Sequence, residues 1–191
     1  MSKLQITPLI VVSAPSGAGK SSFCRKAVED FDQLVELISC TTRAMRPGEA
    51  EGDPYFFMDR ERFLQLRDKG HFIEWAEVYG NFYGTPKNQV DRARAQGKWA
   101  ITDVDVQGAH SFRKIYPDAT TIFILPPNID ELRRRLEKRD KGKTSNLQMR
   151  LEAAGREIAL APQFQHQIVN DDFDRAYAQF KKIIEELFNS R

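Results

Sequence analysis

Residues 9–22, LIVVSAPSGAGKSS, decide the fold, because an apolar run of strand length leads directly into a glycine-rich stretch that ends in Gly19-Lys20-Ser21. Gly17 and Gly19 allow backbone N–H groups to turn toward an anion, and a helix that follows would direct its positive end at the same anion. In such a loop Lys20 reaches the β- and γ-phosphates, and the Ser21 hydroxyl binds Mg²⁺. The stretch therefore predicts a loop that holds the phosphates of a nucleoside triphosphate.

One position departs from the pattern G-x-x-x-x-G-K-[ST] of such loops, since Ala14 stands where the first glycine is expected. Alanine is acceptable there when its φ is negative. The alternative interpretation is a glycine-rich turn beside a surface lysine, but the strand before the loop and the helix after it favour phosphate binding. The predicted nucleotide-binding residues of the loop are Ala14, Pro15, Ser16, Gly17, Ala18, Gly19, Lys20, Ser21 and Ser22.

The composition indicates a single domain with insertions, since the chain has 191 residues and 41% of them are hydrophobic. The 29 basic residues nearly balance the 27 acidic ones, so charge gives no reason to expect binding to nucleic acid or to a membrane. Cys24 and Cys40 are too few for a disulfide framework or a zinc site. No apolar run has the length of a signal peptide or a membrane span, so a cytoplasmic location is expected. The oligomeric state is left open.

Short apolar runs separated by helical patterns predict a doubly wound parallel sheet of five strands. Amphipathic spacing predicts helices over residues 130–138 and 173–188. Thr85 followed by Pro86 predicts the start of a further helix, which ends at Gly97. The five predicted strands are residues 9–13, 36–39, 99–104, 120–125 and 167–169.

Residues 43–83 do not follow this alternation, because they are rich in turn residues, aromatic residues and charges. We expect them to form an inserted unit with a small antiparallel sheet and one helix over 59–68. Residues 138–145, KRDKGKTS, lie between two helical patterns and predict a mobile loop.

Two arginines in the inserted unit predict an anion site, since Arg43 and Arg46 stand three positions apart before a Pro-Gly turn. Two guanidinium groups so placed can bind one phosphate monoester through paired hydrogen bonds. Tyr55 and Tyr83 are suited to donate to the remaining phosphate oxygens. The alternative is a solvated charged loop beside core aromatic residues.

Glu74 lies in the otherwise apolar run His71-Phe72-Ile73-Glu74-Trp75-Ala76, where an unpaired buried carboxylate would be unfavourable. Guanine offers it a partner, because the N1–H and the N2 amino group of guanine are adjacent donors that adenine lacks. The alternative is a strand that alternates its two faces, with Glu74 in water.

Asp103 and Asp105 lie at the carboxyl end of the predicted strand 99–104, the edge where α/β sheets bind ligands. The two carboxylates are suited to bind Mg²⁺ or substrate. The alternative for Asp105 is to cap the next helix.

Taken together, these segments resemble the guanylate kinase family of P-loop nucleoside monophosphate kinases over nearly the whole chain. The matching segments, in the order of the family, are residues 16–21, 39–43, 46–49, 52–57, 72–74, 83–85, 103–108 and 168–172. The resemblance implies an α/β fold with three parts: a P-loop kinase core (about 1–38, 86–137 and 151–191), a GMP-binding insertion (about 39–85) and a mobile lid (about 138–150).

The resemblance also implies roles for individual residues. Arg43, Arg46, Tyr55 and Tyr83 match ligands of the GMP phosphate. Arg135, Arg139 and Arg150 match arginines that close over the transferring phosphoryl group and, with Lys20 and Arg43, form the expected catalytic set. Asn170 matches the loop on the adenine side. The expected substrate-binding residues are Ser39, Arg43, Arg46, Glu49, Tyr55, Glu74, Tyr83, Thr85, Asp103 and Asp105, and Ser21 is the expected metal ligand.

The implied activity is transfer of the γ-phosphoryl group of ATP to GMP, and to dGMP, with Mg²⁺, in purine nucleotide metabolism. No catalytic base is required when the nucleophile is already an ionised phosphate. Two alternatives are a non-catalytic guanylate-kinase-like module that binds phosphorylated peptides, and a P-loop kinase of another monophosphate. Lys20 and Ser21 argue against the first alternative, and Glu74 with Ser39 and Thr85 argues against the second.

Overall fold

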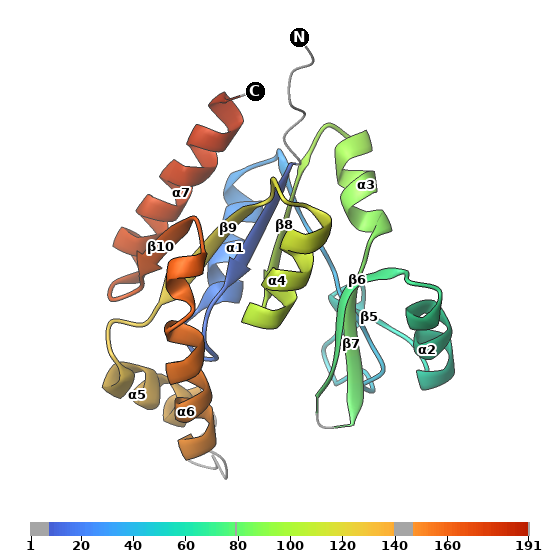
Figure 1. The fold of residues 1–191 in the computed structure, drawn as a ribbon, viewed down its shortest axis with the longest axis horizontal. Coiled ribbons are helices and arrows are strands. Elements are labelled where there is room, and N and C mark those ends of the chain that lie inside the picture. The colour runs from blue at the N-terminus through green and yellow to red at the C-terminus, as the bar shows by residue number, and fades with distance from the viewer. Residues whose placement is uncertain (1–7, 79, 140–146, 191) are drawn as a thin grey trace.

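The computed structural model describes residues 8–78, 80–139 and 147–190, which form two sheets flanked by helices (Figure 1). The main sheet contains β1 (Leu9–Ser13), β2 (Leu34–Glu36), β8 (Trp99–Val104), β9 (Thr120–Leu125) and β10 (His166–Val169). The second sheet contains β3 (Cys40–Thr41), β4 (Ala50–Glu51), β5 (Pro54–Phe57), β6 (Phe72–Val78) and β7 (Asn81–Pro86). The helices are α1 (Lys20–Asp30), α2 (Arg60–Asp68), α3 (Asn88–Ala95), α4 (Val106–Ile115), α5 (Ile129–Arg139), α6 (Leu147–Ile158), α7 (Phe173–Asn189) and a 3₁₀ turn, η1 (Ala161–Gln163).

The main sheet is parallel throughout, in the order β10-β9-β1-β8-β2, so the predicted five-stranded sheet is confirmed. Successive side chains of the central strand β1 point to opposite faces. Ile10 and Val12 pack against α1 and α7, whereas Leu9 and Val11 pack against α3 and α4. Because helices cover both faces, the carboxyl ends of the strands provide the open edge where the phosphate loop begins.

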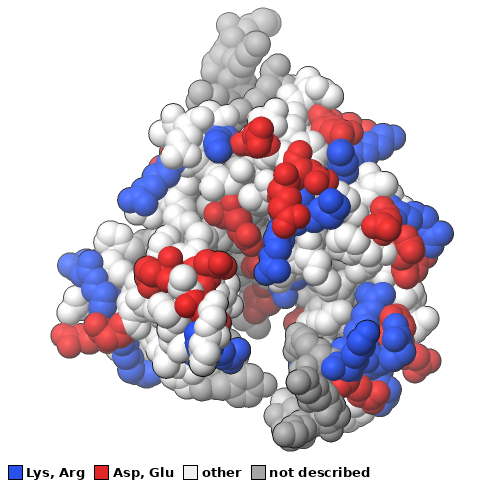
Figure 2. All heavy atoms as spheres, turned by 180° about the vertical axis from the view of Figure 1, so that it is seen from behind, with Lys and Arg blue, Asp and Glu red and all other residues white. Residues whose placement is uncertain are grey.

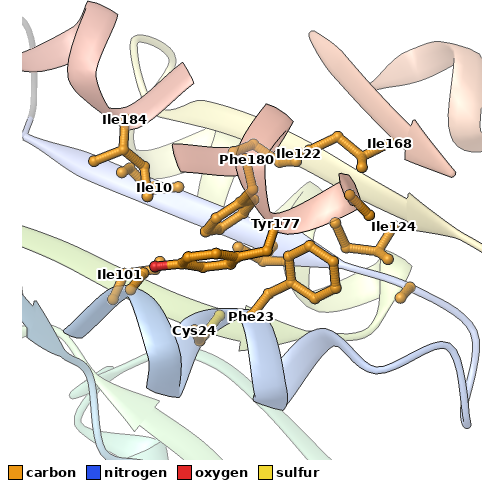
Figure 3. Packing of buried hydrophobic residues seen from close by; sticks show 14 of the residues in the cluster. Ile10, Phe23, Cys24, Ile101, Ile122, Ile124, Ile168, Tyr177, Phe180 and Ile184 are labelled. Carbon is orange, nitrogen blue, oxygen red and sulfur yellow. The ribbon is translucent and has the colours of Figure 1, made fainter. Parts of the chain in front are cut away.

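The core between the sheet and helices α1 and α7 is built around Phe23, which is fully buried (Figure 3). Its ring lies 5.3 Å from that of Phe180 and 5.1 Å from that of Phe173, both in edge-to-face contact. Tyr177 packs beside them, and its hydroxyl donates to Asp30 Oδ2 over 2.8 Å. This packing fixes α1, the helix whose first turn carries Lys20 and Ser21.

Strand β2 ends earlier than predicted, since it covers residues 34–36 rather than 36–39. The chain continues along β8 only as far as Leu37, whose N–H donates to Ile101 O. At Ile38 the side chain of Gln89 replaces the neighbouring strand, because it accepts from the Ile38 N–H over 2.8 Å and donates to the Ile38 carbonyl. Ser39 then joins the second sheet by accepting a hydrogen bond from the Phe56 N–H.

The second sheet has the order β4-β5-β3-β7-β6 and is mixed. The expected antiparallel pairing is present between β6 and β7 and between β3 and β7, but β5 runs parallel to both β3 and β4. The parallel pairing of β3 with β5 uses a crossover of about a dozen residues, which the segment 42–53 provides.

Helix α2 packs on the second sheet through the buried Phe63, whose ring stacks on Phe72 at 4.5 Å and on Phe82 at 5.3 Å. Asp59 caps this helix by accepting from the Arg62 N–H, in agreement with the helix predicted over 59–68. The start predicted for the next helix is wrong, because α3 begins at Asn88 and Thr85 belongs to β7. Thr85 is fully buried, and its hydroxyl is bonded to side chains of the sheet rather than to a helix end.

Candidate functional site

The predicted phosphate loop connects β1 to α1 at the carboxyl edge of the main sheet. Gly17 and Gly19 have φ of +94° and +101°, a conformation that side chains other than glycine rarely adopt. Ala14 is 2% exposed and packs in the core below the loop, which explains why alanine replaces the first glycine of the pattern. The loop, Lys20, Ser21, Ser22 and Arg135 line a hollow of about 240 Å³. The N-terminus of α1 faces an anion-sized space, as the sequence predicts.

Ser21, next to Lys20 in the first turn of α1, meets Asp103 of β8, and the Ser21 hydroxyl donates to Asp103 Oδ2 over 2.6 Å. A hydroxyl and a carboxylate are hard oxygen ligands of the kind that Mg²⁺ prefers. Within the described residues, no group of three or more His, Cys, Asp or Glu side chains is placed to hold a metal ion. The pair therefore fits a magnesium ion that keeps most of its ligands from water and substrate phosphates.

Asp105 caps α4, because its Oδ1 accepts from the Gly108 N–H over 2.7 Å. The alternative that Asp105 caps the next helix is therefore confirmed, and the cap uses its Oδ1 oxygen. A side chain at Gly108 would collide with Val104, so the turn between β8 and α4 is tightly packed.

Two of the three arginines predicted to close over the transferring phosphoryl group contact the loop or its supports. Arg135 donates to Glu131 Oε1 over 2.8 Å and to the Asn170 carbonyl over 2.9 Å. Arg150, on α6, donates to the Ser16 hydroxyl over 2.8 Å. The hydrogen bonds from Arg134 and Arg135 lower the pKa of the Glu131 carboxyl to about 2, so Glu131 stays ionised and holds Arg135. Arg139 ends α5, and its side chain lies outside the described structure, as do residues 140–146 of the predicted lid.

Asn170 follows β10 and is 5% exposed. Its side-chain amide donates to the Ala18 carbonyl over 2.8 Å, directly beneath the phosphate loop.

The predicted phosphate site of the insertion gathers around Arg43. Its guanidinium donates to both carboxylate oxygens of Glu49, over 2.8 and 3.0 Å, and lies 5.6 Å from the centre of the Tyr55 ring. The rings of Tyr55 and Tyr83 lie 5.6 Å apart. The hydrogen bonds from Arg43, and the one from the Arg46 N–H, hold the pKa of the Glu49 carboxyl below its usual value. The side chain of Arg46 is exposed.

Glu74, Thr85 and Ser39, predicted to contact guanine, form one hydrogen-bonded row. The Thr85 hydroxyl donates to Glu74 Oε1 over 2.7 Å and lies 3.0 Å from the Ser39 hydroxyl. Burial raises the pKa of the Glu74 carboxyl, and the hydrogen bond from Thr85 partly opposes this rise. Glu74 therefore does not simply face water, the alternative left open by the sequence.

A second cavity of about 270 Å³ joins the two halves of the site, because Ser21 and Asp103 line it together with Ser39 and Tyr55. Seen from behind, the molecule has an open hollow between the inserted sheet and the part that carries α5 and α6, with side chains of both charges around it (Figure 2).

Among the residues that line this cavity, sequence reasoning missed three charged ones, which are Arg25, Glu36 and Asp53. Glu36 stands at the carboxyl end of β2, and that position could have identified it. Burial raises the pKa of the Glu36 carboxyl, and the nearby Asp103 carboxylate adds to the effect. Glu131 was also missed, although its spacing of four residues from Arg135 on one helix is a recognisable signal.

Comparison with known proteins gives a consistent result. The family model described as guanylate kinase matches residues 6–187. The chain is 48% identical over 181 residues to a guanylate kinase of Bdellovibrio bacteriovorus, an alignment that covers 95% of this chain and 98% of the relative. It is 47% identical to a guanylate kinase of Bordetella pertussis, covering 92% of this chain and 82% of the relative.

The solved structures agree with this. The guanylate kinase from Anaplasma phagocytophilum superposes with a TM-score of 0.73 at 35% identity, covering 93% of this chain and 84% of that one. The shikimate kinase from Bacteroides thetaiotaomicron superposes with a TM-score of 0.52 at 12% identity, covering 93% of this chain and 98% of that one, which shows a shared fold alone. Among the described residues no helix is both long and apolar enough to span a bilayer.

Proposed function

The chain belongs to the guanylate kinase family, and on that premise we propose that it transfers the γ-phosphoryl group of ATP to GMP, giving GDP and ADP. The observation that carries this proposal is the shared cavity. Ser21 and Asp103 of the phosphate-loop side line it together with Ser39 and Tyr55 of the inserted sheet. A donor phosphate chain and an acceptor monophosphate bound on these two sides would face each other across it.

On the donor side, the loop amides and Lys20 bind the β- and γ-phosphates at the N-terminus of α1. Arg135 and Arg150, which the structure holds beside the loop, neutralise charge on the group in transfer, and Arg139 joins them. When bound, Mg²⁺ supplies further neutralisation of the phosphate oxygens, with Ser21 as its ligand and Asp103 beside it.

On the acceptor side, Arg43, Arg46, Tyr55 and Tyr83 bind the phosphate of GMP. Glu49 orients Arg43 through a bidentate ion pair. Glu74 accepts the N1–H and N2 donors of guanine, while Ser39 and Thr85 complete the row that holds the base. Asp105, at the start of α4, is the remaining residue that we assign to substrate binding, and its charge adds to burial in raising the pKa of the Glu74 carboxyl.

The reaction needs alignment of the two phosphates rather than a catalytic base, since the acceptor is already ionised. GMP and dGMP differ only in the sugar, and we propose both as acceptors. We place the reaction in the cytoplasm, where both substrates are found, and the two buried cysteines, which form no disulfide, agree with a reducing compartment. For the chain we propose the three-part division predicted from the sequence, with a core, a GMP-binding insertion over about 39–85 and a lid over about 138–150.

A coupled assay with ATP and each of GMP, dGMP, AMP, UMP and CMP tests the proposal. We expect turnover with the guanine nucleotides and at most traces with the others. Preference for another nucleotide would identify a different monophosphate kinase. A lack of turnover with every acceptor, together with binding of a phosphorylated peptide, would identify the non-catalytic module instead.

A further inference from the structure

Asn170 occupies the point where the phosphate loop, the end of the main sheet and α5 meet. Its own N–H donates to the Leu125 carbonyl at the end of β9, over 2.8 Å. Its carbonyl accepts from Arg135, and its side-chain amide donates to the Ala18 carbonyl. With an exposed fraction of 5%, the residue is enclosed by the groups that it binds.

The contact with Ala18 determines which way one peptide group of the loop points. The peptide unit that joins Ala18 to Gly19 is planar and trans, so its carbonyl and its N–H point in opposite directions. Because Asn170 holds the carbonyl on the sheet side, the Gly19 N–H is turned to the other side of the loop. Gly19 lines the hollow of about 240 Å³ there.

The same side chain also fills the space below Gly19. A Cβ atom at Gly19 would lie 2.9 Å from Asn170 Nδ2, closer than real side chains come. The amide therefore packs against the loop as well as bonding to it, and both contacts oppose a rotation of this peptide.

We propose that Asn170 is a positioning residue that holds the Ala18–Gly19 peptide so that the Gly19 N–H points at the donor phosphates. The inference rests on the proposed function for the identity of the donor. It assigns Asn170 a different role from membership of the loop on the adenine side, because its side chain is buried under the phosphate loop and its amide donates to the Ala18 carbonyl. The carbonyl of Asn170 gives Arg135 its second anchor, so one residue orients both the loop and an arginine beside it.

Inorganic tripolyphosphate provides the test, because it has the phosphates of ATP and neither base nor sugar. Calorimetric titration of Asn170→Ala should show that the affinities for tripolyphosphate and for ATP fall by the same factor, on the order of tenfold. This factor corresponds to the cost of leaving a buried carbonyl without its donor. In the transfer assay KM for ATP should rise by a similar factor. The kcat and KM for GMP should stay near wild type, since the backbone carbonyl that binds Arg135 is retained.

Asn170→Asp is the second variant, because it keeps the size of the side chain but replaces the donor amide with an acceptor. It should bind tripolyphosphate no better than Asn170→Ala. The matched control is Asp172→Ala at 0.15 M salt, where long-range effects of an exposed charge are screened. Asp172 caps α7 two positions further on, so this variant should lower the melting temperature without changing tripolyphosphate affinity.

A result in which ATP binding weakens while tripolyphosphate binding is unchanged would place Asn170 against the base and overturn the inference. Wild-type affinity of both variants for both ligands would overturn it too. The proposed function is tested separately. A wild-type protein that binds tripolyphosphate but transfers nothing to GMP would refute the activity, and the titration of the Asn170 variants would still test the role of Asn170 in the loop.

Discussion

Single polar side chains of the site are held by one another before substrate binds. Thr85 holds Glu74, Glu49 holds Arg43, and Glu131 holds Arg135. Side chains fixed in this way lose less conformational entropy when they bind a ligand, and the partner keeps each charged group from pairing elsewhere. Each pair is therefore a place where one substitution should affect binding or rate more than folding.

Lys20→Ala should abolish turnover while the melting temperature stays close to that of the wild type. Lys20 is the loop's own cation at the donor phosphates, and none of the described residues takes its place in the first turn of α1. The measurements are the coupled assay and a thermal melt of the same preparation. A folded variant with near wild-type turnover would refute the assignment of the phosphate loop.

Glu74→Gln should lower kcat/KM for GMP by about 2–3 kcal/mol of transition-state binding and leave AMP almost unaffected, because the new amide places a donor against a donor of guanine. The measurement is kcat/KM for GMP and for AMP in wild type and variant. An unchanged ratio of GMP to AMP would mean that Glu74 does not read the base.

The raised pKa of Glu74 adds a dependence on pH. Only the ionised carboxylate accepts both guanine donors, so GMP affinity should fall as pH is lowered through this pKa, beginning above the usual glutamate value of about 4.5. Burial of this carboxylate also makes the folded state bind its proton more tightly, so its contribution to stability decreases as pH rises from about 4.5 through the raised pKa. Glu74→Gln should lack both effects, which separates them from titration of the nucleotide.

Among the elements, the strands of the main sheet were the most predictable. The limits of β1, β8 and β9 agree with the sequence prediction, because each is a buried apolar run ended by a loop or a helix cap. Strand β2 was not predictable, because its end depends on Gln89, which lies about fifty positions further along the chain.

The candidate site also contains parts that the sequence predicts and parts that depend on the fold. The phosphate loop is a local motif, so residues 14–22 could be assigned from their order alone. That a carboxylate in the run around Glu74 needs a partner also follows from the sequence, but the partner, Thr85, is fixed by the register of β6 against β7. The ion pair of Arg43 with Glu49 depends on the path of the turn between β3 and β4, which no local pattern specifies.

Two glycines give opposite expectations for stability. Gly84 in β7 is packed so tightly that a Cβ would lie 3.1 Å from both Phe63 and Phe72, so Gly84→Ala should cost about 1–3 kcal/mol of unfolding free energy. Gly155 lies inside α6, and among the described residues no atom apart from its chain neighbours and its own helix backbone comes within 4 Å of the point where a Cβ would stand. Gly155→Ala should therefore stabilise by about 0.5–1 kcal/mol. Denaturant unfolding of both variants decides this, and a neutral Gly84→Ala would contradict the packing of α2 on the second sheet.

In the molecule as a whole, the inserted sheet and the part that carries α5 and α6 face each other across an open hollow (Figure 2). Segments far apart in the sequence also meet on the donor side, where Arg150 on α6 donates to the Ser16 hydroxyl of the loop. A ligand held between such parts can be shielded from water, the acceptor that would compete with GMP.

Arg150→Ala should reduce kcat by more than it raises KM for GMP, because this arginine lies on the donor side and is proposed to stabilise charge in the transition state. Steady-state kinetics with GMP varied at saturating ATP make the comparison. A rise in KM for GMP at constant kcat would instead assign Arg150 to binding of the acceptor.

The side chain of Gln89 has a further consequence, which concerns how the molecule can be observed. It accepts a hydrogen bond from the Ile38 N–H where the chain passes from the main sheet into the second one, so this amide proton exchanges with solvent deuterium when that hydrogen bond breaks. The protection of Ile38 in wild type, measured with and without nucleotide, therefore reports how often this contact is open, and Gln89→Ala supplies the unprotected reference. The Gln89 side chain thus makes the Ile38 amide a probe of the junction between the two halves of the site.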